Sequence, residues 1–171
     1  MVIAFYIAIA VALLATVLVI TGRNPVHALL YLVVSLLAVA VIFLLLGAPF
    51  AAALEVIIYA GAIMVLFLFV VMMLTVGTGE TAAPLLRPRA WIGPSLLAAV
   101  LLIELAAWLA LGMPSHGQAH PVAPKAVGTA LLGPYLLAVE LASMLLLAGL
   151  VGAWHLGRPD DSAAPQRQAL S

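Results

Sequence analysis

Residues 50–76 form an apolar run that limits what this chain can fold into more than any other feature. The run carries one charged side chain, Glu55, and it exceeds the roughly 20 residues that a helix needs to cross the hydrocarbon layer of a bilayer. Over the whole chain, 67% of the residues are hydrophobic and 7% are charged. Soluble domains are about one-quarter charged, so the sequence predicts an integral membrane protein.

Turn-forming residues divide the chain into five predicted transmembrane helices. Asn24-Pro25 is typical of a helix start, since Asn caps well and Pro fits the first helical position. Gly47-Ala48-Pro49 is a connection short enough to favour an antiparallel hairpin. The expected fold class is therefore all-α integral membrane. The predicted spans are about residues 2–20, 26–46, 50–76, 91–111 and 134–155, within a membrane domain of residues 1–156 that precedes a mobile tail of residues 157–171.

The distribution of basic residues predicts the orientation of these spans. We expect the first span to be retained, because no basic region precedes it, and five spans place the termini on opposite sides of the membrane. One side then carries Lys125 alone, and the other carries Arg23, Arg87, Arg89, Arg158 and Arg167. Because basic loops remain cytoplasmic, we expect a periplasmic N-terminus and a cytoplasmic C-terminus.

Three glutamates, Glu55, Glu104 and Glu140, lie inside predicted spans. An ionised side chain in lipid costs about 3 kcal/mol, so we expect these carboxylates to be buried against protein or trapped water. Glu55 and Glu140 each follow the proline at their helix entry by six residues, which predicts a matched depth of about 9 Å. They either share a hydrated cavity that relays protons or bond neighbouring helices as neutral side chains. For Glu104, near Trp108, the packing role is favoured.

The middle of the third span combines a polar pair with a group of small residues. Tyr59 follows Glu55 by four residues and shares its helical face. Ala60, Gly61 and Ala62 indicate close helix packing or a local π-helical turn, a feature that clusters at functional sites. In the fifth span, Ser143 is expected to bond Glu140 or its own helix backbone.

Several classes of chemistry have no support in the sequence. The chain has no cysteine, and its six basic and six acidic residues give no basic surface for nucleic acid. It lacks a phosphate-binding glycine loop, a nucleophile–base pair and a cluster of metal or haem ligands. His116 and His120 lie in a Gly/Pro-rich loop where their spacing fixes no geometry. We therefore expect no metal site and no cofactor bound by this chain, which acts as a conduit, a sensor or a structural subunit.

Three segments are similar to one protein family. They read NPVHALLY at residues 24–31, LEVIIYAGAIMVLF at residues 54–67 and GPYLLAVELASMLLLAGL at residues 133–150. These segments resemble the subunit J family of bacterial NADH:quinone oxidoreductase, respiratory complex I, which corresponds to mitochondrial subunit 6. The similarity covers spans one to three and five, and no functional role is transferred to Glu104 in the fourth span.

The resemblance implies a non-catalytic subunit of an enzyme complex in the bacterial inner membrane. Its expected partners, besides the lipid bilayer, are the quinone-site subunit, small subunit K, the small membrane subunit designated A, and the antiporter-like subunits. FMN, iron–sulfur clusters and quinone are expected in other subunits. It also implies a proton path or hydration tuning at Glu55, Tyr59 and Glu140. The implied π-bulge, whose switching opens a water path between quinone reduction and proton translocation, involves Tyr59, Ala60, Gly61, Ala62, Met64, Val65 and Phe67.

Two other functions are compatible with the residues alone. One is a subunit of a related cation/proton antiporter complex, which would lack NADH-linked partners. The other is a free-standing small channel, which would form a symmetric homo-oligomer instead of occurring once among unlike neighbours.

Overall fold

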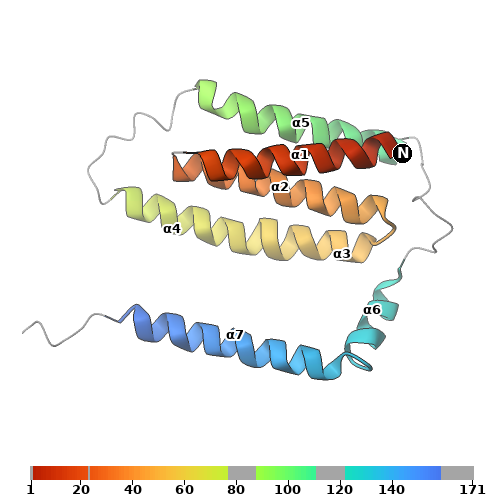
Figure 1. Cartoon of the computed structure of the whole chain (residues 1–171), viewed down its shortest axis with the longest axis vertical. Helices are drawn as coiled ribbons and strands as arrows, with labels where there is room; N and C mark the ends of the chain where they lie inside the picture. Colours follow the sequence, from red (N-terminus) through yellow and green to blue (C-terminus); the bar gives the residue numbers. More distant parts are fainter. Residues whose placement is uncertain (1, 23, 77–87, 111–121, 159–171) are drawn as a thin grey trace, which may run out of the picture. The chain divides into compact units, whose positions relative to one another are not determined.

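The chain folds into helices throughout the residues that its computed structural model describes, 2–22, 24–76, 88–110 and 122–158. It divides into two compact units, residues 1–123 and residues 124–171. Unit 1 contains α1 (Val2–Thr21), α2 (Pro25–Leu45), α3 (Pro49–Leu54), the π-helix η1 (Glu55–Ile63), α4 (Met64–Val76) and α5 (Pro88–Ala110) (Figure 1). Unit 2 contains α6 (Pro124–Leu131) and α7 (Leu136–Leu156).

Five helical segments are long and apolar enough to cross a membrane, as predicted, with α3, η1 and α4 together making the third span. The predicted span ends agree with the helix ends to within a few residues. One helix was not predicted, because α6 lies in a region whose glycines and prolines we interpreted as a loop. Pro124 stands at its first position, where the missing N–H of proline is tolerated.

Local capping explains where α2 begins and ends. The Asn24 side chain accepts a hydrogen bond from the Val26 N–H at 3.0 Å, and Pro25 is the first helical residue, which confirms the predicted start. At the other end, Gly47 adopts φ 80°, in the left-handed region that glycine tolerates best. The chain reverses there and enters α3 at Pro49.

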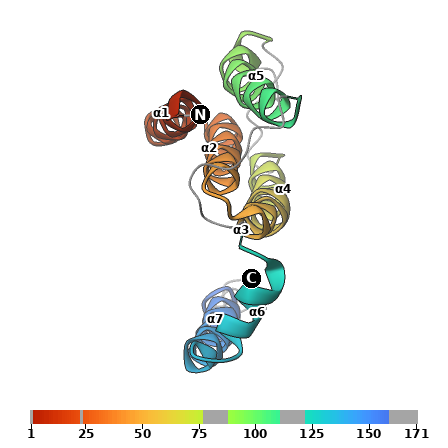
Figure 2. The ribbon, with the colours of Figure 1, turned by 90° about the vertical axis from the view of Figure 1, so that its right-hand side faces the viewer.

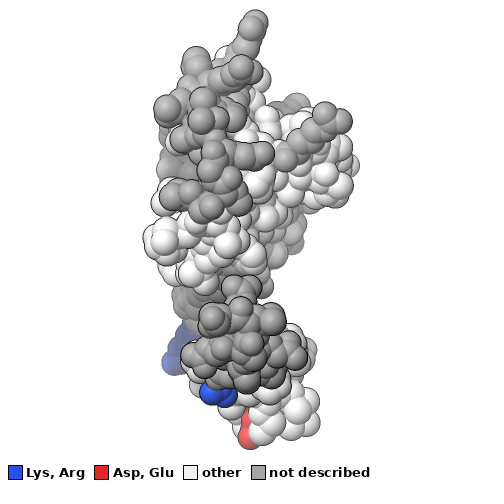
Figure 3. Space-filling model, turned by 90° about the vertical axis from the view of Figure 1, so that its left-hand side faces the viewer, with Lys and Arg blue, Asp and Glu red and all other residues white. Residues whose placement is uncertain are grey.

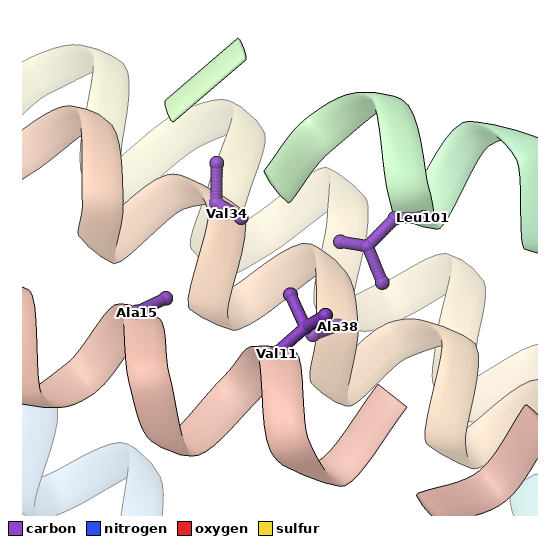
Figure 4. Close-up of a cluster of buried hydrophobic side chains, with 5 residues drawn as sticks. All are labelled: Val11, Ala15, Val34, Ala38 and Leu101. Atoms are coloured by element: carbon purple, nitrogen blue, oxygen red, sulfur yellow. The ribbon is translucent and has the colours of Figure 1, made fainter. Parts of the chain in front are cut away.

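Helix α2 lies at the centre of unit 1, in contact with α1, α5 and all three parts of the third span (Figure 2). Small and branched side chains fill its contact with α1 and α5, as Figure 4 shows for Val11, Ala15, Val34, Ala38 and Leu101. The alanines allow the helix backbones to approach closely, as is common between membrane helices.

Two further contacts hold α1 and α5 against α2. The hydroxyl of buried Ser35 lies 2.9 Å from the Thr16 hydroxyl and 3.2 Å from the Ala12 carbonyl oxygen, which bridges α1 and α2. On the other side, the Tyr31 hydroxyl occupies the space that a Cβ atom at Gly93 would fill. The absence of a side chain at Gly93 therefore lets α5 approach α2 at this point.

The surfaces of both units are mostly apolar. Large hydrophobic side chains are exposed on all five spans, and Figure 3 shows a face whose described surface is almost entirely uncharged. Within unit 2, no described side chain of α7 is buried. Such a surface suits lipid and neighbouring membrane helices.

Parts of several predictions lie outside the described residues. These are most of the tail, residues 159–171, and the two long loops with His116 and His120. Of the basic residues used to predict orientation, Arg23, Arg87 and Arg167 lie there too, so the orientation of the termini stays a prediction.

Candidate functional site

The third span contains a π-helix, η1, between two α-helical segments. At its start, the Glu55 N–H is shared between the carbonyl oxygens of Ala51 and Ala52. After its last residue, the Met64 N–H donates to the carbonyl oxygen of Tyr59, five residues back. This five-residue spacing defines a π-helix, which usually occurs as a single-turn bulge at functional sites. At nine residues, η1 is longer than such a bulge.

The local sequence explains why the chain forms π-helical turns in η1. Residues 56–58 are three consecutive β-branched side chains, a run that lowers α-helix propensity. A Cβ atom at Gly61 would lie 3.0 Å from the carbonyl oxygen of Val56, which is tighter than ordinary van der Waals contact. A larger side chain at position 61 therefore requires this carbonyl to move, so glycine removes an obstacle to the π-helical register.

The residues expected to form a π-bulge divide between two elements. Tyr59, Ala60, Gly61 and Ala62 lie in η1, whereas Met64, Val65 and Phe67 lie in the first turn of α4 and just after it. Met64 is buried, with 9% of its surface exposed. In contrast, Tyr59, Val65 and Phe67 are about half exposed. Unit 1 thus covers one side of the span and leaves the other side open.

The expectation of buried carboxylates is wrong for this chain by itself. No glutamate in the described ranges is buried as a whole residue, although Glu104, which is half-buried, has both carboxyl oxygens shielded from solvent. Glu55 is half-buried, and Glu140 is exposed within unit 2. The physical reason is a shortage of neighbours: among the described elements, α2 makes the main contact along the third span, and α6 makes the main contact with α7 within its unit. One chain cannot shelter an acid that faces away from its own helices.

The local contacts of the predicted polar residues differ from one to the next. The Ser143 hydroxyl donates to the backbone carbonyl of Glu140 at 2.7 Å, which is the second of the two bonds we predicted for it. Glu104 lines a pocket between α1, α2 and α5 that Glu55 does not reach. Because Glu55 and Glu140 belong to different units, a cavity shared between them stays a prediction.

Sequence reasoning missed a second pocket, which lies beside η1. It has a volume of about 530 Å³ between α2, the third span and α5, and every lining residue is apolar. Val56 and Ile57 of η1 form part of its wall, together with Ala40, Ala52, Ala53 and Ala98. The sequence feature that could have indicated this pocket is the group of alanines on α2, α3 and α5, because small side chains leave space between helices. Because packed interiors resist deformation, the side of η1 that faces this pocket is less constrained than a fully packed helix face.

The described residues do not suggest a metal site. Within the four ranges of chain that the structure covers, no three His, Asp or Glu side chains gather closely enough to hold a metal ion. The site therefore consists of one carboxylate, one phenol and a helix of unusual register in an apolar setting.

Comparison with known proteins assigns the chain to a family. Residues 15–156 match the family described as NADH-ubiquinone/plastoquinone oxidoreductase chain 6. NADH-quinone oxidoreductase subunit J of Pseudomonas aeruginosa is 62% identical over 160 residues, which cover 92% of this chain and 96% of that one. Subunit J of Escherichia coli K12 is 57% identical over 160 residues, covering 92% and 86%. Subunit J of Rhodobacter capsulatus is 40% identical over 159 residues, covering 88% and 78%.

These matches extend through all five spans, including the fourth, and they favour complex I over an antiporter assembly or a free-standing channel. The chain belongs to the subunit J family of NADH-quinone oxidoreductase, the chain 6 family of complex I, and it is a membrane subunit of that enzyme complex.

Proposed function

We propose that this subunit couples quinone reduction to proton translocation through a change of helical register in its third span. The observation that carries the proposal is η1, a nine-residue π-helix inside a membrane span. Its hydrogen-bond geometry is less common than that of an α-helix, and the pocket beside it leaves room for rearrangement. Both properties support two registers of similar free energy.

A change of register alters which side chains face α2. Each residue of an α-helix advances about 100° around the axis, so absorbing or releasing one residue in η1 rotates α4 by about 100° relative to α3. If η1 tightens by one residue, Ile63 takes the buried direction of Met64, and Met64 takes the direction of Val65. The register thus controls which residues line the surface that neighbouring subunits meet.

The polar residues give this rotation a consequence for water. Glu55 and Tyr59 lie four residues apart in η1, among apolar side chains. They can hold water in one register and lose it in the other, which would tune hydration or open a proton path. Glu140 provides a third polar position in the fifth span. In this proposal Glu55 tunes hydration and does not itself transfer the proton.

The remaining walls of the water path belong to other chains in this proposal. The quinone-site subunit, small subunit K, the small membrane subunit designated A, and the antiporter-like subunits surround the third and fifth spans and shelter the carboxylates that this chain leaves uncovered. FMN, iron–sulfur clusters and quinone lie in other subunits. The complex occupies the bacterial inner membrane, with the N-terminus of this chain periplasmic and its C-terminus cytoplasmic.

Added bulk at Gly61 tests the proposal. Gly61→Val in the intact complex should reduce proton pumping per NADH oxidised about tenfold, with normal assembly. The added side chain meets the Val56 carbonyl, and overpacking of about 1–3 kcal/mol shifts a two-state equilibrium at least several-fold. Gly149→Val in α7 is the control, since a Cβ there meets nothing within 4 Å in the described chain. Normal pumping by the Gly61 variant would exclude the switch.

The register itself can be measured because the chain has no cysteine. In complexes carrying Ile63→Cys or Met64→Cys, maleimide labelling of this subunit should change in opposite directions between the resting and turnover states. Labelling that is unchanged at both positions would show that α4 does not rotate.

Substitution can rank the two glutamates outside η1, Glu140 and Glu104, by their effect on proton pumping. Glu140→Gln should reduce proton pumping at least threefold more than Glu104→Gln, because the proposal places only Glu140 beside the water path. Proton uptake in reconstituted vesicles, normalised to NADH oxidation, measures both variants. Equal losses would contradict this ranking.

A further inference from the structure

A pocket of about 340 Å³ lies between the first half of α1, the last residue of α2 and the second half of α5. Ile3 and Ile7 of α1, Leu45 of α2 and Ile103 of α5 form much of its apolar wall. Glu104 and Trp108 also line it and are its polar side chains. The coupling mechanism uses neither residue, so the pocket needs an explanation of its own.

Both polar groups lack a partner in the described chain. The two carboxyl oxygens of Glu104 and the indole Nε1 of Trp108 are shielded from solvent, and none of them has a hydrogen-bond partner among the described residues. Shielded polar atoms in folded proteins nearly always have a partner. The two residues are four positions apart on α5, so their side chains lie on the same helix face. A single bound molecule can therefore reach both once the two side chains rotate toward the pocket that they line.

The pocket lies near the end of a candidate membrane span, and span ends are where the apolar and polar zones of a membrane meet. Trp108 is two residues and Glu104 six residues before the end of α5, or about 3 Å and 9 Å along the helix. The start of α1 lies beside that end (Figure 1). Tryptophan is enriched at the interface, where its ring meets hydrocarbon and its N–H meets polar groups. The pocket thus has its polar groups toward the interface and apolar walls along its length.

We propose that this pocket binds a bilayer phospholipid. An acyl chain lies against the isoleucines of α1 and α5, and the ester carbonyl oxygen accepts hydrogen bonds from the Trp108 Nε1–H and from Glu104 as a neutral acid. A small rotation of the two side chains brings their polar atoms toward the pocket that they line. Mostly apolar walls with a few convergent polar groups are typical of small-molecule sites of this size.

Other occupants fit the pocket less well. Each buried water needs two to four polar partners, and two polar side chains leave most of the space without any. The rim is apolar, since Ile3 and Ile103 are 75% and 70% exposed. It therefore opens toward hydrocarbon and not toward water.

The charge of the pocket predicts which head groups it accepts. Among the described lining residues there is no Lys or Arg to pair with a phosphate. The site should therefore recognise the ester and the acyl chain, without preference for anionic head groups.

Photo-crosslinking in the intact complex tests the site. The complex is reconstituted in phosphatidylcholine vesicles with a trace of phosphatidylcholine that carries a diazirine near the ester end of one acyl chain, and labelled peptides are identified by mass spectrometry. Label is expected on residues 3–7 and 103–108. Ala107→Trp, which fills the pocket, should reduce it at least fivefold. Ala99→Trp, on an exposed part of α5 outside the pocket, should leave it unchanged.

Milder variants test the hydrogen bonds that Trp108 and Glu104 donate to the lipid ester. They also replace Ala107→Trp as the test if that variant fails to assemble. Trp108→Phe keeps the ring but removes the N–H, and Glu104→Leu removes the acid. Each should reduce labelling at least twofold, whereas Glu104→Gln, which keeps a donor, should stay near the parent value. Unlabelled phosphatidylglycerol and phosphatidylcholine should compete equally. Labelling that none of these variants lowers, label confined to a neighbouring subunit, or strong preference for phosphatidylglycerol would overturn the proposal.

Discussion

Two regions of unit 1 are built from the same kinds of residue but are packed differently. One is the contact that α2 makes with α1 and α5, and the other is the third span. Between α1, α2 and α5, five side chains are buried in one cluster, and hydroxyls bridge two of the helices. Along residues 49–74 of the third span, whose exposure the structure describes, Ala52 and Met64 are the buried residues, and the middle of the helix is in the π register. One region is held by its own chain, whereas the other is loosely packed and is the region that our proposal makes movable.

This comparison teaches how a small membrane subunit can be both anchored and movable. Apolar composition alone creates no attraction between helices in lipid, so close packing and hydrogen bonds decide which contacts are tight. The alanines and hydroxyls of α1 and α2 supply both. The third span has alanines on its inner side but faces a pocket there, so it retains freedom. Substitutions in the two regions should therefore affect different measured quantities.

The largest effect on stability is expected at the centre of the packed cluster. Leu101→Ala should destabilise the subunit by about 2–3 kcal/mol, because Leu101 is 5% exposed and its loss leaves a cavity. Leu102→Ala is the matched control, since its side chain is 66% exposed. The melting temperature of the purified complex and the amount of this subunit retained in it measure both. Equal losses would place the tight contact elsewhere.

A somewhat smaller effect is expected where α5 meets α2. Gly93→Ala should cost about 1–2 kcal/mol, because the new methyl group collides with the Tyr31 hydroxyl. Adding Tyr31→Phe removes that hydroxyl and should recover part of the loss in melting temperature. Gly61→Ala should, in contrast, change pumping more than stability. If the two glycine variants behave alike, the division into anchor and movable span is wrong.

The smallest effect is expected from the hydroxyls between α1 and α2. Ser35→Ala should cost about 0.6 kcal/mol, the average for such bonds between membrane helices. Thr21→Ala is the control, because its hydroxyl bonds the Val17 carbonyl of its own helix. A melting temperature for Ser35→Ala that matches the control would show that this bridge adds nothing to the anchor.

The helices were predictable because their signals are local. Asn24 and Pro25 specify the start of α2 through their own bond and ring, and the length of each apolar run matches a bilayer thickness. Gly61, with Ala60 and Ala62 beside it, pointed to the weak position in the third span. The three segments that resemble subunit J are also short, continuous stretches of sequence. The comparisons with known proteins confirmed the family that these segments indicated.

The sequence by itself determined that the chain is a five-span, all-helical membrane subunit, because hydrophobic length and capping act over neighbouring residues. Only the tertiary structure decided which carboxylate is shielded. Sequence reasoning gave Glu55 and Glu140 priority, yet the oxygens of Glu104 are the ones shielded from solvent. The exposure of a side chain depends on which distant helices pack against its face. In unit 1, α1 and α2 flank the face of α5 that carries Glu104, whereas the third span packs mainly against α2 and meets α5 across a pocket.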